Sequence, residues 1–485
     1  MHASKRMTAA LVLMSLLLSA CGSAPQATTV PTVVPEATTT EQEVPATAVV
    51  VEEPTVAEEP TVAPDTAATG DKTTISFWFN PPEEGEAADC FVTNAIDKFN
   101  AKSTTTMVEA IPQPNAWDAT RTALAGGAGP DVITTPGPSF AFELVQAGQL
   151  LPLDEYVEQL KWSDRFVPWA LNLGKVEGKL YSIPNELETL VMYYNKTLFE
   201  EKGWQPPKTI DELMTLGEKI KAEGIIPFGH ANAEWRPANE WFVGEFLNKV
   251  AGPDKVYEAL KGTRPWTDPE FVRAIEVLNT IQQKGWFMGG LERYYTATFD
   301  EAHAALGNGE AAMNIEGTWF LNDISTVFGE AAGNNNDWGW VPVPSTSGDA
   351  IFNLGIGSTY SINKATKNPQ AVVEFIDYVF SADVQGTLVA ECNAAPAPIR
   401  LKADALAGID PRKAEIFEAL STASDQNNYG YTTWTFWPPK SDTYIYEEVE
   451  KVWANTMTSQ EYLEGLQKLF AEELKAGDIP PLPTR

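Results

Sequence analysis

Apolar positions between residues 75 and 147 alternate between short continuous runs and stripes at helical spacing. The runs predict strands at 75–79, at 108–111 and within 126–135, and the stripes predict helices at 92–99, 117–124 and 140–147. A strand followed by a helix and then by another strand is the repeating unit of parallel α/β sheets. We therefore expect this part of the chain to build such a sheet.

The stretch 178–229 carries the clearest local signals and reads as strand, bend, strand and two helices. The run LVMYY at 190–194 is almost wholly apolar, as expected of a strand that is covered on both faces. Thr209 and Glu212 have the spacing of a capping box, and Gly224 is suited to end the helix that this box begins.

Further along the chain, the same two patterns continue. Helices are expected at 269–283, 368–380, 411–422, 443–456 and 459–475, and strands at 338–344 and 358–362. The segment 299–306 leads through a glycine-rich turn to Ala311. The Ala-Ala-Met segment at 311–313 is interpreted as a helix end.

The N-terminus reads as a targeting segment. Lys5 and Arg6 precede the apolar run 11–18, which is too short to span a membrane and has the flanks of a signal peptide. The ending Leu-Ser-Ala-Cys resembles a bacterial lipobox, which implies a signal peptide at 1–20 and lipidation of Cys21. The alternative is an ordinary secretory signal with an unrelated cysteine.

The amino-acid composition of residues 21–70 differs sharply from that of the rest of the chain. Pro, Thr, Val, Ala and Glu dominate, and no aromatic or basic residue occurs between Gly22 and Gly70. Such a segment cannot bury enough apolar surface to offset the entropy of ordering. We expect a disordered tether, extended at roughly 3 Å per residue, that reaches on the order of 100 Å from the membrane.

Charge and length narrow the functional class. About 415 residues follow the tether, enough for two domains. The formal net charge is −32, and removal of the signal peptide makes the chain more acidic. Nucleic acids and anionic membrane surfaces attract basic faces, so neither is an expected partner. Contact with the membrane is expected through the lipid anchor only.

The three cysteines are compatible with two interpretations, one with a disulfide and one without. If Cys21 is lipidated, Cys90 and Cys392 form one available disulfide pair in an oxidising compartment. The alternative is two unrelated buried thiols.

Seven short motifs occur in an order that is similar to that of one family. They are GPDV at 129–132, AGQLLPLD at 147–154, GKLYSIP at 178–184, YNK at 194–196, PKTIDEL at 207–213, AAM at 311–313 and TKNP at 366–369. Each motif is weak alone, but their order behind a lipobox resembles the bacterial extracellular solute-binding protein family 1, the carbohydrate-binding lipoproteins of ABC importers. The likeness runs from about residue 74 to about 476.

The resemblance implies an α/β periplasmic-binding-protein type II fold with two discontinuous lobes, similar in layout to maltose-binding protein. It assigns 71–186 and 353–399 to lobe 1, and 187–352 and 400–485 to lobe 2, with hinge crossings between them. Cys90 and Cys392 then fall in the same lobe, which favours a disulfide.

In function, the resemblance implies a binding protein rather than an enzyme. It would hold a sugar or oligosaccharide in an interlobe cleft and deliver it to the transmembrane permease subunits by hinge closure. We expect a monomer without cofactor or metal, lipid-anchored on the outer face of the cell membrane. Because the loop 134–139 lacks the Trp, Asp and Arg that grip maltose in the relative, maltose itself is not implied.

Sugars need aromatic rings for their apolar faces and polar side chains for their hydroxyls. Trp319 has the position of a stacking tryptophan in the resemblance, and Glu316 precedes it by three residues. Glu188 aligns with a hinge carboxylate, and Glu186 shares its face of an extended segment. The alternatives are a core tryptophan and a solvated strand edge.

Other candidates come from three further segments. A loop after a strand end supplies Trp235, Arg236, Glu240 and Trp241, although Trp241 could instead begin a buried helix face. The first strand ends at Trp78 and Asn80. An aromatic loop contains Tyr431, Trp434 and Trp437, and one of these side chains is expected to reach the cleft. Trp437 is the candidate from this loop, and Tyr444, further along the chain, is another.

Two rival readings remain. A surface glycosidase could use Glu186 and Glu188, but two residues of one strand do not flank a bond as the paired carboxyls of glycosidases do. The same fold could bind glycerol phosphate or another polyol, for which Arg236 would be the candidate phosphate partner. Tyr193 and Tyr194 superficially resemble the tyrosine pair of ferric-ion binders, yet adjacent strand residues point in opposite directions.

Overall fold

The computed structural model describes residues 72–80, 89–399, 409–426 and 428–483, all within one unit that begins at Ala67. The expected signal peptide (1–20), the lipidation site Cys21 and the tether (21–70) lie outside the described residues. Within the described part, none of the helices is both long enough and apolar enough to cross a membrane.

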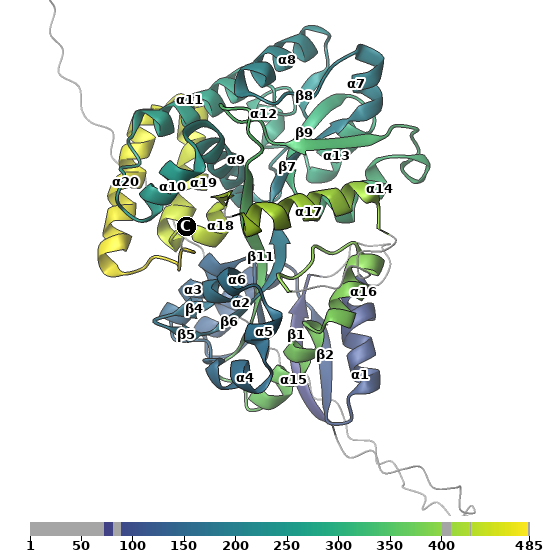
Figure 1. Ribbon diagram of the computed structural model, residues 1–485, viewed down its shortest axis with the longest axis vertical. Coiled ribbons are helices and arrows are strands. Elements are labelled where there is room, and N and C mark those ends of the chain that lie inside the picture. The colour runs from purple at the N-terminus through teal and green to yellow at the C-terminus, as the bar shows by residue number, and fades with distance from the viewer. Residues whose placement is uncertain (1–71, 81–88, 400–408, 427, 484–485) are drawn as a thin grey trace, which may run out of the picture. The chain divides into compact units, whose positions relative to one another are not determined.

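Two α/β lobes, each with its own sheet, form this unit (Figure 1). The first sheet has the strand order β12-β11-β3-β1-β2, and β6 also pairs with β11. Its strands are β1 (Thr73–Phe79), β2 (Thr106–Pro112), β3 (Val132–Thr135), β6 (Ser182–Glu188), β11 (Phe352–Ile362) and β12 (Tyr429–Tyr431). β1 runs parallel to β2 and β3, as the sequence predicts, whereas β11 runs antiparallel to β3 and β6.

Helices from two separated parts of the chain accompany the first sheet. They are η1 (Val92–Ile96), α1 (Asp97–Lys102), α2 (Ala116–Ala125), α3 (Pro138–Gln146), α4 (Asp154–Gln159), α5 (Trp162–Arg165), α6 (Pro168–Leu173), α15 (Pro369–Val379) and α16 (Ala382–Cys392). A small hairpin of β4 (Lys175–Val176) and β5 (Lys179–Leu180) precedes β6. The apolar face of α15, with Phe375 and Ile376 fully buried, joins Ile75 and Phe77 of β1 in one core.

The second sheet has the order β10-β7-β9-β8. Its strands are β7 (Leu190–Asn195), β8 (Ile226–Phe228), β9 (Ala311–Gly317) and β10 (Trp338–Pro342). Val191, Met192 and Tyr193 of β7 are fully buried, which confirms the strand that the LVMYY run predicts. Both neighbours of β7 are antiparallel to it.

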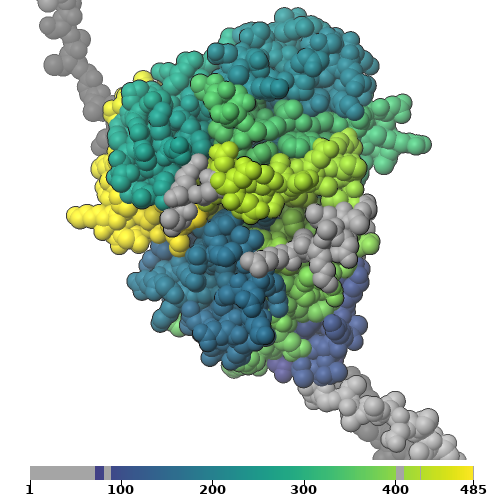
Figure 2. Space-filling view, in the orientation of Figure 1, coloured from purple at the N-terminus to yellow at the C-terminus, as the bar shows by residue number. Residues whose placement is uncertain are grey.

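The second lobe carries most of the helices. The first group is α7 (Lys196–Lys202), α8 (Ile210–Ala222), η2 (Arg236–Ala238), α9 (Asn239–Phe246), η3 (Leu247–Ala251), α10 (Pro253–Leu260), α11 (Pro269–Gln283), α12 (Leu291–Tyr294), α13 (Phe299–Gly307), η4 (Thr318–Asn322), α14 (Ile324–Val327) and η5 (Glu330–Ala332). The C-terminal group is α17 (Pro411–Asp425), α18 (Thr433–Phe436), α19 (Pro439–Trp453) and α20 (Ser459–Ala476). Figure 2 shows the yellow C-terminal residues against the teal helices of this lobe.

The capping box at the start of α8 forms as the sequence predicts. The amide of Glu212 donates to Thr209 Oγ1 at 3.1 Å, and the Thr209 amide donates to Glu212 Oε2 at 3.2 Å. These two bonds satisfy donors that a helix N-terminus otherwise leaves unpaired.

Two expectations about local structure are wrong. The Ala-Ala-Met segment belongs to strand β9 rather than to a helix end, and all seven residues of β9 are buried. The apolar run Ala311 to Met313 is too short for its periodicity to separate strand from helix. The strand expected at 358–362 is also longer, because β11 begins at Phe352 and pairs with β12 before it reaches β3.

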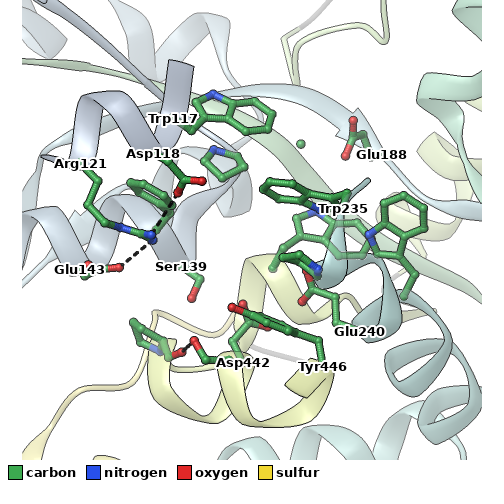
Figure 3. Close-up of a pocket in the computed structure, with 18 of the residues that line it drawn as sticks. Trp117, Asp118, Arg121, Ser139, Glu143, Glu188, Trp235, Glu240, Asp442 and Tyr446 are labelled. Carbon is green, nitrogen blue, oxygen red and sulfur yellow. Dashed lines mark hydrogen bonds and ion pairs between the residues drawn. The ribbon is translucent and has the colours of Figure 1, made fainter. Parts of the chain in front are cut away.

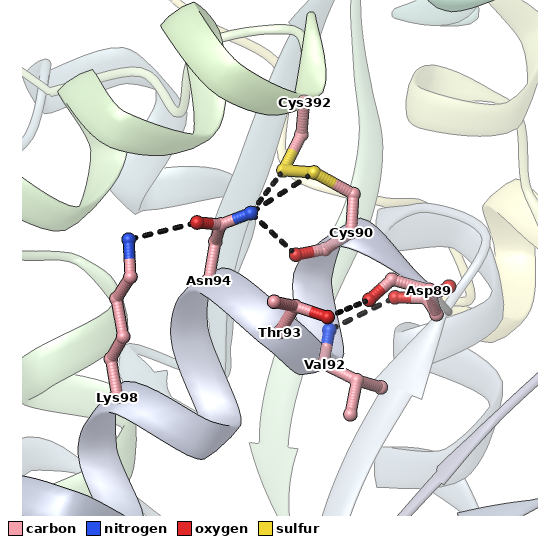
Figure 4. The surroundings of a disulfide bond; sticks show 7 residues. All are labelled: Asp89, Cys90, Val92, Thr93, Asn94, Lys98 and Cys392. Carbon is pink, nitrogen blue, oxygen red and sulfur yellow. Dashed lines mark hydrogen bonds between the residues drawn. A yellow bond between two sulfur atoms is a disulfide. The ribbon is translucent and has the colours of Figure 1, made fainter. Parts of the chain in front are cut away.

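A disulfide joins Cys90 to Cys392, two residues that are 302 positions apart in the chain (Figure 4). It links the segment before η1 to the last residue of α16, and their Cα atoms lie 5.6 Å apart. The side-chain amide of Asn94 donates to the carbonyl oxygen of Cys90 at 3.2 Å. The bond therefore ties the beginning of the first lobe to its second chain segment.

Candidate functional site

A cavity of about 680 Å³ is lined by residues from both lobes (Figure 3). From the first lobe come residues of α2, α3, β6 and β11, and from the second come η2, α9, η4, α18 and α19. β6 ends at Glu188 and β7 begins at Leu190, so the chain passes from one sheet to the other at the edge of this cavity. Its volume is that of a site for a small organic ligand.

Tryptophan dominates the apolar part of the lining. Trp241 and Trp319 have ring centroids 4.8 Å apart, and Trp434 meets Trp319 edge-on at 6.0 Å. On another side Trp117 of α2 meets Trp235 edge-on at 6.2 Å, so the two lobes touch through this pair. A ligand in this cavity would therefore meet several large, flat aromatic surfaces.

Carboxyl side chains dominate the polar part. They are Asp118, Glu143, Glu186, Glu188, Glu240 and Asp442. Arg121 donates to Asp118 at 3.4 Å and to Glu143 at 3.2 Å, and its guanidinium lies over the Phe140 ring (Figure 3). The Arg121 guanidinium thus forms ion pairs with two of the six carboxylates.

Glu186 and Glu188 lie where β6 approaches the second lobe. Glu186 has a φ of 57°, a left-handed conformation that is unusual for a residue with a side chain, and its carboxylate accepts from Ser358 Oγ at 2.6 Å. Burial raises the pKa of Glu186, although the Ser358 hydrogen bond opposes that change. Burial also raises the pKa of Glu188 well above its ordinary value, and the negative charge of Glu186 raises it further.

Gly357 of β11 makes room for the Glu188 carboxyl group. A Cβ atom at position 357 would lie 2.1 Å from that group, closer than any real contact. The glycine therefore allows the carboxyl group to lie against the strand at the edge of the cavity, where both residues line it.

Glu240 and Asp442 form a second carboxyl pair at the opposite side of the cavity (Figure 3). Burial raises the pKa of Glu240 well above its usual range, and the nearby Asp442 carboxylate adds to this. Burial likewise raises the pKa of Asp442 to about 6, although its hydrogen bond with Glu240 opposes this change. Both groups are thus costly to ionise in these surroundings.

Glu316 does not line the cavity itself but lies next to the lining residue Trp319. It is 3 % exposed, and it accepts from Trp319 Nε1 at 3.3 Å, from Asn314 Nδ2 at 2.5 Å and from His303 Nε2 at 2.8 Å. Burial alone would raise the pKa of Glu316, but the charge and hydrogen bond of His303 lower it below the ordinary value. An ionised Glu316 holds the Trp319 indole in place by its N–H group.

The structure brings half of the predicted site residues together. Six of them line the cavity: Glu186, Glu188, Trp235, Glu240, Trp241 and Trp319. Trp78 and Asn80 line a separate cavity of about 380 Å³, which shares Glu186 and Trp117 with the main one.

Four predicted residues lie elsewhere. Two nitrogen atoms of Arg236 donate to the Glu450 carboxylate at 2.8 Å, and a third donates to Glu447 at 3.0 Å. Glu316 does not line the cavity but accepts a hydrogen bond from the Trp319 indole. Trp437 is fully buried against Trp266. The Tyr444 hydroxyl donates to the carbonyl oxygen of Tyr462 at 3.0 Å. Within the aromatic segment 431–437, the residue that lines the cavity is Trp434.

Sequence reasoning missed the contribution of three helices. They supply Trp117, Asp118 and Arg121 from α2, Ser139, Phe140 and Glu143 from α3, and Asp442, Thr443 and Tyr446 from α19. The spacing of Trp117 and Arg121 puts them on one helix face directly after β2, which is a usable signal. Among the described residues, no group of three or more His, Cys, Asp and Glu side chains is arranged to hold a metal ion.

Comparison with known proteins places these features in a family context. The chain is 26% identical over 340 residues to the multiple sugar-binding protein of Streptococcus mutans, covering 66% of this chain and 76% of that protein. It is 26% identical over 272 residues to the diacetylchitobiose binding protein of Streptomyces coelicolor, covering 53% and 55%.

The fold has counterparts among solved structures. A chitin oligosaccharide binding protein superposes with a TM-score of 0.69 at 22% identity, covering 83% of this chain and 99% of that one. A maltotriose-bound maltodextrin-binding domain from Bdellovibrio bacteriovorus gives 0.63 at 20% identity, covering 83% and 100%. The sequence profile described as bacterial extracellular solute-binding protein matches residues 86–386. The chain therefore belongs to the bacterial extracellular solute-binding protein family, whose members are binding proteins of ABC importers rather than enzymes.

Proposed function

We propose that this protein captures a sugar or oligosaccharide between its lobes and delivers it to the permease of an ABC importer. The observation that carries the proposal is the cavity in which five tryptophans and six carboxyl groups meet. Pyranose rings have apolar C–H faces that pack on aromatic rings, and their hydroxyls donate to carboxylates. The similar proteins of Streptococcus mutans and Streptomyces coelicolor are a multiple sugar-binding protein and a diacetylchitobiose binding protein, which agrees with this ligand class.

The mechanism follows from where the cavity lies. A ligand that contacts α2 and α3 on one side and α9 and α19 on the other favours the closed arrangement by its added contacts. We propose that the hinge lies where β6 passes into β7 and where β11 passes Gly357, with lobes divided near residues 187, 353 and 400. The closed form, acting as a monomer, would then dock on the permease.

The alternative ligands find less support in the cavity. Arg236, the candidate for a phosphate, is held by Glu447 and Glu450, and Arg121 is shared by two carboxylates. Tyr193 is fully buried and donates to the carbonyl oxygen of Gly317 at 3.1 Å, which is unlike an iron ligand in a cleft. Phosphate and ferric ions are therefore disfavoured relative to uncharged or cationic sugars.

A thermal-shift screen against mono- and oligosaccharides tests the proposed function. A bound sugar at a hundred times its Kd stabilises the folded state by about 2.7 kcal/mol, so we expect a rise in Tm of several degrees. A reaction-product assay on the same mixtures should detect no turnover. If no saccharide in a broad panel raised Tm at millimolar concentration, the proposal would be wrong.

We further propose that Cys21 carries the lipid that retains the protein at the outer face of the membrane. The support is the Leu-Ser-Ala-Cys sequence after the apolar run 11–18. The wild-type protein should partition into the detergent phase of a Triton X-114 extraction, while Cys21→Ser should move to the aqueous phase or remain unprocessed. Detergent partitioning of a processed Cys21→Ser protein would contradict lipidation at this residue.

A further inference from the structure

The charge of the cavity lining is strongly one-sided. Glu186, Glu188, Glu240 and Asp442 have no ion-pair partner among the described residues, and Arg121 is already shared by Asp118 and Glu143. Carboxylates that are withdrawn from water without a cationic partner are costly to keep ionised. A ligand that brings positive charge would remove this cost.

The supply of hydrogen-bond donors is equally unbalanced. A neutral sugar hydroxyl donates one hydrogen bond and can accept two, so a site for neutral sugars needs donors as well as acceptors. Among the described lining residues there is no Lys, His, Asn or Gln. Ser139 Oγ already donates to the carbonyl oxygen of Trp437 at 2.9 Å, and Thr443 Oγ1 donates to that of Pro439 at 3.0 Å. The remaining donors are the indole N–H groups of the lining tryptophans, the Tyr446 hydroxyl and the shared Arg121 guanidinium, and of these Trp434 Nε1 has no hydrogen-bond partner among the described residues. The twelve oxygen atoms of the six carboxyl groups still outnumber the donors that are not already engaged.

One of these acceptors is buried and unpaired. Glu240 is 5 % exposed, and its Oε2 atom has no hydrogen-bond partner among the described residues. The same holds for the Oδ1 atom of Asp442, the neighbouring carboxyl group. The two carboxyl groups are hydrogen-bonded to each other, but no donor among the described residues reaches these two particular oxygen atoms. At one side of an aromatic cavity, such a pair can accept hydrogen bonds from a group that only donates.

We propose that the ligand is an amine-bearing saccharide whose ammonium group binds between Glu240 and Asp442 while its rings pack on the tryptophans. This inference rests on the proposed function, because it names the chemical class of the sugar in the same cavity. An ammonium group has three donors and no acceptor, and it is attracted to the faces of tryptophan rings. The three donors complement the carboxyl acceptors of the lining, and the attraction to aromatic faces complements its tryptophans.

The pH dependence of binding gives an independent readout. The ionisable groups that face the cavity are Asp118, Arg121 and Glu143 from α2 and α3, Glu186 and Glu188 from β6, Glu240 from α9, and Asp442 and Tyr446 from α19, with Glu473 acting on Asp442 from α20. An ammonium favours the ionised carboxylates, so binding below pH 7 must displace protons from groups such as Asp442, whose pKa is about 6. Affinity for the amine ligand should therefore rise from pH 5 to pH 7.

The test compares three series of β-1,4-linked oligosaccharides that differ only at one ring substituent. Glucosamine oligomers carry an ammonium, N-acetylglucosamine oligomers carry a neutral amide, and glucose oligomers carry a hydroxyl; glucosamine, galactosamine and their neutral parents complete the panel. Calorimetry at pH 6.5 should give at least tenfold tighter binding of an amine-bearing member than of its neutral counterparts, with release of protons to the buffer.

Two variants and a control locate the effect. Glu240→Gln and Asp442→Asn each keep the side-chain shape, and each should lower the ratio of amine to neutral affinity at least tenfold. Glu276→Gln removes the same charge from the exposed face of α11, outside the lining, and should leave the ratio unchanged. Because the two variants are independent, failure of one to fold leaves the other as the test, and Tm checks folding.

The outcomes separate the two proposals. Neutral sugars that bind as tightly as their amine counterparts, or bind alone, overturn the amine inference and leave the sugar-binding function standing. An unchanged ratio in a folded Glu240→Gln or Asp442→Asn protein also overturns it. If neither amine-bearing nor neutral saccharides bind, both proposals fail.

Discussion

Replacement of Trp319 by alanine is expected to weaken saccharide binding by ten- to a hundredfold and to leave the protein folded. Trp319 is partly buried and lies between Trp241 and Trp434, while Glu316 accepts from its indole N–H at 3.3 Å. These neighbours hold the ring rigid before a ligand arrives, so little entropy is lost on binding. Loss of about 60–100 Å² of apolar contact with a sugar ring costs about 1.5–2.5 kcal/mol, close to the stated range of affinity.

Isothermal titration with the tightest sugar of the thermal-shift screen measures this effect. Trp340→Ala is the matched control, because Trp340 is also a partly buried tryptophan but lies in β10 and does not line the cavity. Its affinity should equal that of the wild type. Unchanged affinity in a folded Trp319→Ala protein would remove this residue from the binding site.

Loss of the Cys90–Cys392 disulfide should have the largest effect on stability. The bond closes a loop with a sequence separation of 302, and cross-links of long loops restrict the unfolded chain most. The chain-entropy model gives an upper value of about 6 kcal/mol for a loop of this length, and removal of a native disulfide typically costs about 2–5 kcal/mol. The double variant Cys90→Ser/Cys392→Ser should therefore lose about 3–5 kcal/mol of unfolding free energy. The double variant is preferred because a single substitution leaves a reactive free thiol.

Urea unfolding of the wild type and the double variant, followed by tryptophan fluorescence, measures the difference. Wild-type protein in a reductant should approach the midpoint of the double variant, while the variant itself should not respond to reductant. Equal midpoints for oxidised wild type and double variant would contradict a stabilising bond. Titration of a bound sugar with both proteins separates a loss of stability from a loss of the cavity.

The parts of the fold that the sequence predicts are those set by local chemistry. The parallel strands β1 to β3, the buried run of β7 and the capping box of α8 each follow from residues within a short window. β9 and the first half of β11 do not, because their short apolar runs fit a strand and a buried helix segment equally well. Their identity depends on partners at least 77 residues away in the chain.

The same distinction holds for the cavity. Glu186 and Glu188 are recognisable because Glu188 aligns with a hinge carboxylate in the family resemblance and the two residues alternate along one extended segment. Arg236 is not predictable, because its partners Glu447 and Glu450 lie more than 200 residues further on and take up its donors. Within the aromatic segment, nothing local tells that Trp437 is buried while Trp434 lines the cavity. Only the packing of α18 against α3 and α9 decides this.

The central position of β11 has a consequence for the order in which the protein can fold. β11 pairs with β3, β6 and β12, yet about 220 residues separate the end of β3 from its first residue. An exported chain emerges from its N-terminus, so β3 and β6 have an unpaired edge until residues 352–362 arrive, and Cys90 has no disulfide partner until residue 392 arrives. Exposed strand edges invite aggregation during such an interval. The lobe that begins the chain therefore cannot be completed until β11 and α16 have emerged, and its strand edges are exposed to wrong pairing until then.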